Sequence, residues 1–207
     1  MLNPLRDADV PSASSPTVRA PLFKSLVNAM NANKRQVVLD LGAASTAMLS
    51  MLGRSRTRVE IVDLVHFGGV ERLNAAKPGK ELERVCQSLL PNRDSTDGFD
   101  LVFCWDIPNY LSLPALSALM RAVGQRSKPG ALAHALIAYS ERHMAEHPAH
   151  FMPTADGDLM DRNGDDGVID SPRFTSEALA DNTGSFIIDR ARLLSNGMQE
   201  YLLRFEN

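Results

Sequence analysis

The sequence contains few of the features on which secreted, membrane and nucleic-acid-binding proteins depend. Its 207 residues include only two cysteines, Cys86 and Cys104, which is too few for a disulfide framework. No apolar run reaches the roughly 18 residues that span a bilayer, and the first residues lack the apolar stretch of a signal peptide. The 22 Lys and Arg residues are outnumbered by 25 Asp and Glu residues, which argues against a nucleic-acid partner. We therefore expect one cytoplasmic domain with no membrane partner.

Residues 1–18 differ in composition from the rest of the chain. They are rich in proline and serine and show no hydrophobic periodicity, which predicts a disordered arm. From Pro21 onward, Leu22, Phe23 and Leu26 fall at helical spacing, and this pattern predicts a first amphipathic helix that ends near Asn31. We expect residues 19–207 to form a single domain around one hydrophobic core.

Strand and helix patterns alternate along most of this domain. Short apolar runs predict strands at 36–41, 58–64, 99–105 and 131–139, whereas 65–79 and 140–173 have the composition of loops. The last two strand patterns are joined through Asn196-Gly197, which is typical of a hairpin turn. This order predicts an α/β fold: a doubly wound, mostly parallel Rossmann-like sheet closed by an antiparallel C-terminal hairpin.

A candidate ligand site follows from the ends of these strands. In an open parallel sheet, ligands bind beyond the carboxyl ends of the strands, where the strand order reverses. The turn Asp40-Leu41-Gly42-Ala43-Ala44 ends the first strand and offers small residues for close backbone approach. Asp63 follows at the end of the second strand, about 20 residues later, where a carboxylate can accept both hydroxyls of a ribose.

The same motifs, in this order, resemble the class I S-adenosylmethionine-dependent methyltransferases. Val38–Gly42 is similar to their first motif, Asp63 to their ribose-binding acid and Phe99–Asp106 to their fourth strand. Ser127–Gly130 resembles the turn before their fifth strand, and the terminal hairpin their last two strands. The resemblance covers about residues 20–207 and is greatest to small, uncharacterised bacterial members.

The resemblance implies a methyltransferase that uses S-adenosylmethionine and moves its methyl group to an N, O or S atom of a small-molecule or otherwise unidentified acceptor. Such enzymes mainly align the two reactants, so no strong acid–base pair is required. Asp106 and Tyr110 are the candidate catalytic residues, and no metal site is expected. The residues implied for the cofactor are Asp40, Gly42, Ala43, Ala44, Asp63, Leu64, Cys104 and Trp105.

Two departures from the family pattern leave other interpretations open. The second glycine of the first motif is replaced by Ala44, and only Leu89–Asp94 is available for a third strand. Both departures favour the alternative of a non-catalytic methyltransferase-fold protein that acts as a binding or assembly module. A nicotinamide oxidoreductase ranks third, because its fingerprint has three glycines and only Gly42 is present.

The remaining histidines and acids have plainer interpretations. His134 lies within the predicted fifth strand and is expected to be a core histidine with a hydrogen-bonded ring. His143, His147 and His150 lie near one another in sequence but do not form a convincing ligand set. The acidic segment 161–170 imitates a calcium loop, yet Asp166 stands where the glycine belongs, so a solvated loop is expected.

Overall fold

A computed structural model describes residues 17–30, 33–92, 97–162 and 167–206 of the chain. Residues 1–16 of the predicted arm lie outside the described residues. The prediction was wrong for the end of the arm, because Thr17–Val18 form strand β1, which pairs antiparallel with β8 (Leu159–Asp161). Val18 is only 9% exposed. The strand is therefore held by burial of this side chain and by the pairing of its two residues with β8.

A six-stranded sheet forms the middle layer, with the order β10-β11-β5-β4-β2-β3. β2 pairs parallel with both β3 and β4, and β4 pairs parallel with β5. β11 pairs antiparallel with β5 and with β10. Within the described residues, β3 is the last strand on its side of the sheet, and Leu90–Asn92 form no strand. The strands are β2 (Gln36–Asp40), β3 (Thr57–Ile61), β4 (Phe99–Trp105), β5 (Ser127–Ala138), β10 (Phe186–Leu193) and β11 (Met198–Phe205).

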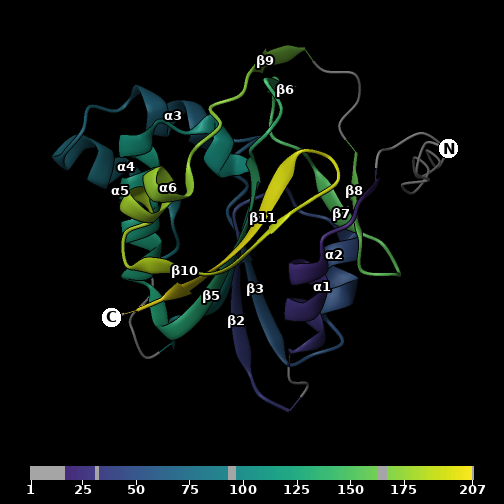
Figure 1. Cartoon of the computed structure of the whole chain (residues 1–207). Coiled ribbons are helices and arrows are strands. Elements are labelled where there is room, and N and C mark those ends of the chain that lie inside the picture. Colours follow the sequence, from purple (N-terminus) through teal and green to yellow (C-terminus); the bar gives the residue numbers. More distant parts are fainter. Residues whose placement is uncertain (1–16, 31–32, 93–96, 163–166, 207) are drawn as a thin grey trace, which may run out of the picture.

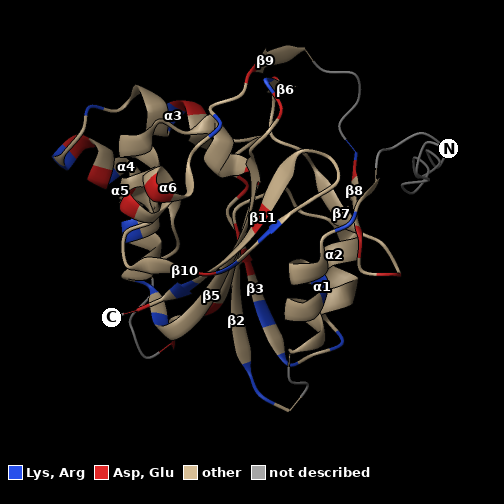
Figure 2. Cartoon of the chain, in the orientation of Figure 1, with Lys and Arg blue, Asp and Glu red and all other residues tan. Residues whose placement is uncertain are grey.

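Helices cover both faces of this sheet (Figure 1). α1 (Pro21–Asn28) and α2 (Thr46–Leu52) lie on one face, and the other four helices lie on the opposite face. Two hydrophobic clusters fill the layers between sheet and helices, as expected for strands buried on both sides. Charged residues lie mostly on the helices and connections, with few on the middle strands (Figure 2). The four other helices are α3 (Gly69–Ala75), α4 (Lys80–Leu89), α5 (Leu113–Gly124) and α6 (Ser176–Asn182).

The mixed α/β class predicted from the sequence is confirmed, but the two predicted loops contain regular structure. Segment 65–79 holds α3, which buries Val70 and Leu73 although two glycines precede them. Segment 140–173 holds short strands that pair as β6 with β9 and β7 with β8. Three-residue strands are too short to show a hydrophobic period, so only their pairing reveals them. They are β6 (His143–Ala145), β7 (Phe151–Pro153), β8 and β9 (Val168–Asp170).

Hydroxyl side chains cap the first turns of two helices. Ser45 caps α2 by accepting a hydrogen bond from Met48 N, and Thr175 caps α6 in the same way from Ala178 N. Gly53 ends α2. In the described part of the chain, no helix has the length and apolar character needed to cross a membrane.

The turn between β10 and β11 provides a first test of the fold. Gly197 has a φ of +78°, and a Cβ atom placed there would lie 2.6 Å from Glu141 Cγ. We expect Gly197→Val to lower the free energy of unfolding by at least ~1–2 kcal/mol, because a β-branched residue resists positive φ. Urea denaturation measures the loss. A Gly197→Val variant as stable as the wild type would contradict the turn geometry.

Candidate functional site

The carboxyl ends of β2 and β3 lie side by side, and backbone hydrogen bonds hold them there. Val62 N donates to Asp40 O at 2.8 Å, and Leu64 N donates to Leu41 O at 2.9 Å. These two bonds continue the parallel pairing beyond the end of β3. They place Asp63, which lies between them, next to the turn that follows Asp40.

Asp40 holds this turn together from inside. Its carboxylate is 2% exposed, and Oδ1 accepts hydrogen bonds from Gly42 N at 2.9 Å and from the Trp105 indole Nε1 at 2.6 Å. Burial raises the pKa of Asp40 to about 6, although the two hydrogen bonds oppose that rise. Asp40 therefore fixes the turn and the indole, and it does not reach out toward solvent.

Trp105 covers the glycine of the turn. A Cβ atom placed on Gly42 would lie 2.6 Å from Trp105 Cδ1, so the ring occupies the open face of this glycine. Trp105 is 4% exposed and has a φ of +52°, a left-handed conformation that is costly for a bulky residue. The ring centroid lies 5.2 Å from that of Phe103, 5.8 Å from Phe23 and 5.9 Å from Phe151. This aromatic packing holds the strained residue in place.

Asp63 lies at the outer side of the same turn. Its side chain is 15% exposed, and its backbone has a φ of +46°. One oxygen accepts a hydrogen bond from His66 N at 3.0 Å, and both oxygens lie 3.1 Å from His66 Nδ1. Since His66 is itself largely exposed, the carboxylate lies at the surface of the site and retains lone pairs for a ligand.

Residues 145–151, which we call the strap, cross over the ends of the strands. The Tyr110 hydroxyl lies 3.0 Å from Ala145 O and 2.8 Å from His147 O, to which it donates. Ala149 N donates to Asp106 Oδ2 at 2.9 Å, and the Phe151 ring stacks on Trp105. Thus both candidate catalytic residues, Asp106 and Tyr110, contact the strap.

His150 brings the strap to the turn itself. The His150 ring makes a hydrogen bond with the backbone of Ala44 and lies 6.4 Å, centroid to centroid, from the ring of His66. Burial, and then the neighbouring His66 and Arg162, lower the pKa of His150. From the sequence, His150 was expected only as one of three histidines that do not form a ligand set. No local spacing signals its contact with Ala44, because more than 100 residues separate the two.

Asp106 offers a pH test of the strap. It is 5% exposed, its Oδ1 has no hydrogen-bond partner within the described residues, and burial raises its pKa to about 7. Between about pH 4 and pH 7 the folded chain therefore holds a proton that the unfolded chain has lost. This contribution to the free energy of unfolding is largest at acidic pH and is lost as the pH rises through about 7.

We expect Asp106→Asn to flatten the decline in stability between pH 4 and pH 8, because an amide does not titrate and its oxygen still accepts from Ala149 N. The measurement is urea denaturation at several pH values. Asp181→Asn, on the exposed face of α6, is the matched control and should keep the wild-type profile. Identical pH profiles for Asp106→Asn and the wild type would contradict the burial of an ionisable Asp106.

The structure separates the other predicted site residues. Ala43 and Ala44 are partly or fully accessible at the turn, and neither has a positive φ. Leu64 is fully buried against Gly69, and Cys104 is buried in the same hydrophobic cluster, which also holds Leu116 of α5. The side chains of Leu64 and Cys104 therefore face the core and not the turn.

The two strand ends differ in how open they are: the end at Asp63 is accessible, whereas the turn at Gly42 is covered. Asp63 presents a partly exposed carboxylate at the outer side of the turn. Over Gly42, however, the indole of Trp105 fills the space that a ligand would need. A ligand that approaches Gly42 from this side would therefore meet the Trp105 ring, whereas Ala43 and Ala44 of the same turn are accessible.

Comparison with solved structures identifies the fold. A methyltransferase from Mesorhizobium loti that depends on S-adenosylmethionine aligns with a TM-score of 0.53 and 17% identity, over 89% of this chain and 96% of that chain. Another, from Methanosarcina mazei, aligns with a TM-score of 0.52 and 15% identity, over 87% of this chain and 97% of that chain. The cyclase SpnF aligns with a TM-score of 0.54 and 11% identity, over 89% of this chain and 80% of that chain. No family model and no curated protein matches the sequence.

The chain therefore has the fold of the class I S-adenosylmethionine-dependent methyltransferases, as its motifs predict. Because all three identities are below 25%, the likeness establishes the fold alone. One of these three structures is named as a cyclase and not as a methyltransferase, so the fold does not by itself fix the activity.

Proposed function

We propose that this protein is an S-adenosylmethionine-dependent methyltransferase that opens its strap and Trp105 to admit the cofactor. The observation that carries the proposal is the position of Asp63 beside the Asp40–Ala44 turn, at adjoining ends of two parallel strands. This is where open parallel sheets bind their ligands. The fold shared with solved methyltransferases supports the same conclusion.

Each group of residues then has a definite task. Asp63 accepts the ribose hydroxyls, and the backbone at Gly42, Ala43 and Ala44 receives the amino-acid end once the indole has moved. When bound, the cofactor supplies a methyl group that its own positive sulfur activates. The strap, closing again through Tyr110, excludes water and holds the acceptor in line with that methyl group.

We propose an N, O or S atom of a small-molecule acceptor as the methyl recipient and the cytoplasm as the place of action. The turn and its surroundings present backbone groups, one carboxylate and two histidines, which suit a small polar ligand. The net charge of −3 argues against a nucleic-acid acceptor.

The packing of Trp105 on Gly42 favours a second candidate function. If the indole never leaves, the turn cannot bind the cofactor, and the chain acts as a non-catalytic binding or assembly module. The φ of +52° at Trp105 and its four aromatic neighbours, including His134, describe a well-packed residue. The two functions differ in whether Trp105 moves.

Ligand binding to the wild-type chain distinguishes these candidates. Isothermal titration with S-adenosylmethionine and S-adenosylhomocysteine should give dissociation constants well below 1 mM if the first proposal holds. Trp105 is the only tryptophan, so its fluorescence should report the displacement of the indole during the same titration. No binding of either compound at millimolar concentration would reject the methyltransferase and leave the binding module.

A further inference from the structure

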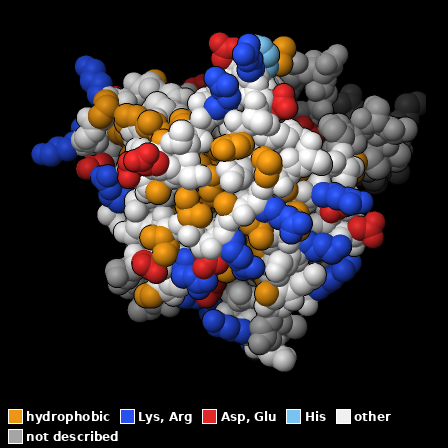
Figure 3. Space-filling view, in the orientation of Figure 1, with side chains coloured by type: hydrophobic (Ala, Val, Ile, Leu, Met, Phe, Trp, Pro, Cys, Tyr) orange, Lys and Arg blue, Asp and Glu red, His pale blue; other side chains and the backbone are white. Residues whose placement is uncertain are grey.

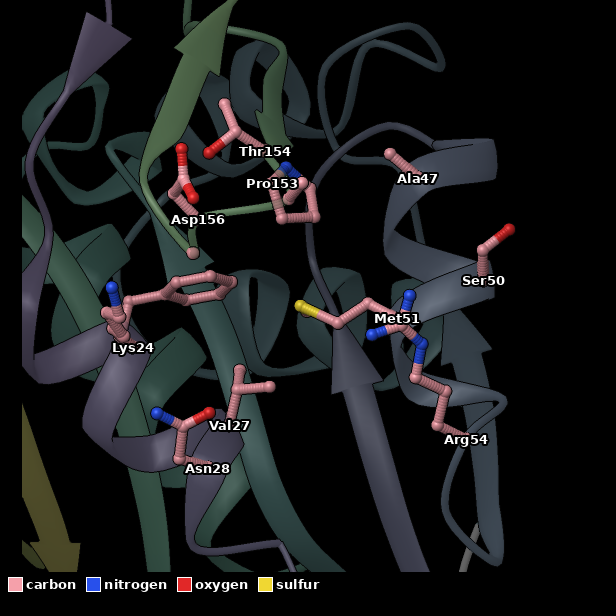
Figure 4. A pocket seen from close by; sticks show the side chains of 13 residues that line it. Lys24, Val27, Asn28, Ala47, Ser50, Met51, Arg54, Pro153, Thr154 and Asp156 are labelled. Atoms are coloured by element: carbon pink, nitrogen blue, oxygen red, sulfur yellow. The ribbon is translucent and has the colours of Figure 1, made fainter.

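A groove with a volume of about 510 Å³ lies between α1 and α2, and none of residues 40–44 lines it (Figure 4). Ligand pockets for small molecules commonly measure about 300–1,000 Å³. Neither Asp40 nor Asp63 lines this groove. It is therefore a separate cavity, and binding of a ligand there does not depend on the proposed function.

Three segments that are distant in sequence build the walls of the groove. Lys24 and Asn28 of α1 face Ser50 and Arg54 of α2 across it, and the turn after β7 crosses its upper end. The floor is apolar, since Phe23, Val27 and Met51 line it, and the Met51 sulfur points into the groove. An apolar floor with a few polar groups at the rim is the usual composition of a small-molecule site.

The charges at the rim favour an anion. Lys24 and Arg54 stand on opposite walls, and neither has an ion-pair partner among the described residues. Asp156, on the turn after β7, is the acid that lines the groove. A neighbouring hollow, which shares Lys24, adds Arg19 and Arg192 and one further acid, Asp158. Figure 3 shows Lys and Arg side chains gathered on this side of the molecule, where α1 and β8 lie.

From this combination we propose that the groove binds a small carboxylate with an apolar, ring-sized body. The body would lie on Phe23, Val27 and Met51, and the sulfur of Met51 makes favourable contacts with an aromatic ring. The carboxylate would lie between Lys24 and Arg54, whose planar guanidinium can hold a carboxylate by two parallel hydrogen bonds.

One side chain, Phe23, connects the groove to the strand ends. Phe23 lines the groove on one side and lies 5.8 Å from the Trp105 ring on the other, measured between centroids. Displacement of Phe23 by a bound ring would change the surroundings of Trp105. Occupancy of the groove should therefore be visible in the fluorescence of the single tryptophan.

The test uses 4-phenylbutyrate as the probe and its uncharged amide as the matched control compound. Two-dimensional NMR should place the largest shifts on α1, α2 and the turn after β7, and Trp105 fluorescence should change with the same midpoint. The double variant Lys24→Gln/Arg54→Gln should weaken binding about tenfold or more. The matched double variant Lys80→Gln/Arg84→Gln, on the exposed face of α4, should bind like the wild type.

Two single variants test the recognition more closely. Ser50→Phe places a ring in the groove from an exposed position of α2 and should abolish binding while the chain stays folded. Asp156→Asn removes the opposing carboxylate and should tighten binding about two- to threefold. Equal affinity for the amide, unchanged affinity in Lys24→Gln/Arg54→Gln, or NMR shifts confined to the Asp63 turn would each overturn the proposal.

Discussion

Glu200→Ala is expected to lower the free energy of unfolding by about 3–5 kcal/mol, because it leaves three buried groups without a hydrogen-bond partner, each at a cost of about 1–3 kcal/mol. Glu200 is fully buried on β11, and its two oxygens accept hydrogen bonds from Leu22 N at 2.9 Å and Phe23 N at 2.7 Å. It also lies 2.9 Å from Nε2 of the fully buried His134, which donates to it. The variant removes the acceptor of two helix N–H groups and of one ring nitrogen.

Urea denaturation measures this loss, and Glu206→Ala is the matched control because Glu206 is exposed on the same terminal segment. The control should change stability by no more than about 0.5 kcal/mol. Glu200→Gln should fall between the two, since one amide oxygen still accepts while the amide nitrogen opposes a donor. A loss below about 1 kcal/mol for Glu200→Ala would show that Glu200 does not anchor α1.

Asp63→Ala is expected to weaken binding of S-adenosylhomocysteine by roughly ten- to hundredfold, which corresponds to one charge-assisted hydrogen-bonded contact of about 1.5–3 kcal/mol. The two carboxylate oxygens can accept both ribose hydroxyls, and the site is only partly open to water. Isothermal titration gives the affinity, and circular dichroism verifies that each variant is folded.

Asp63→Asn is the informative comparison for this position. Asn tolerates the φ of +46° as Asp does, so the variant keeps the backbone and loses only the charge. Its affinity should lie between those of the wild type and Asp63→Ala, and Asp181→Ala on α6 should bind like the wild type. If Asp63→Ala binds the ligand as tightly as the wild type, the ribose lies elsewhere, although the fold is unaffected.

The order of strands and helices could be predicted because it depends on local patterns. The apolar run at 99–105, for example, is long enough to be recognised as a buried strand. The helix in segment 65–79 could not be recognised, since α3 has only seven residues and begins within the pair Gly68-Gly69, which is typical of a loop. The strands between 143 and 170 could not be recognised either, because three residues are too few to show a hydrophobic period.

The candidate site was predictable only in part. Asp40, Gly42 and Asp63 could be chosen because strand ends and their spacing are visible in the sequence, and the structure brings them together. The direction of the Trp105 indole over Gly42 could not be predicted, because it depends on a left-handed backbone and on aromatic rings from three other segments. The contacts of Asp106 and Tyr110 with the strap could not be predicted either, because they join residues 35 to 43 positions apart.

The sequence by itself determined the α/β class and the order of the motifs, because both rest on patterns between residues close in the chain. Tertiary structure alone decided that Glu200 anchors α1, that residues 145–151 lie across the strand ends and that α1 and α2 leave a groove between them. These features join residues up to 178 positions apart, as in the bond from Leu22 N to Glu200. Such contacts have no local signature, because their energy comes from burial and pairing that exist only after the sheet and both helix layers have assembled.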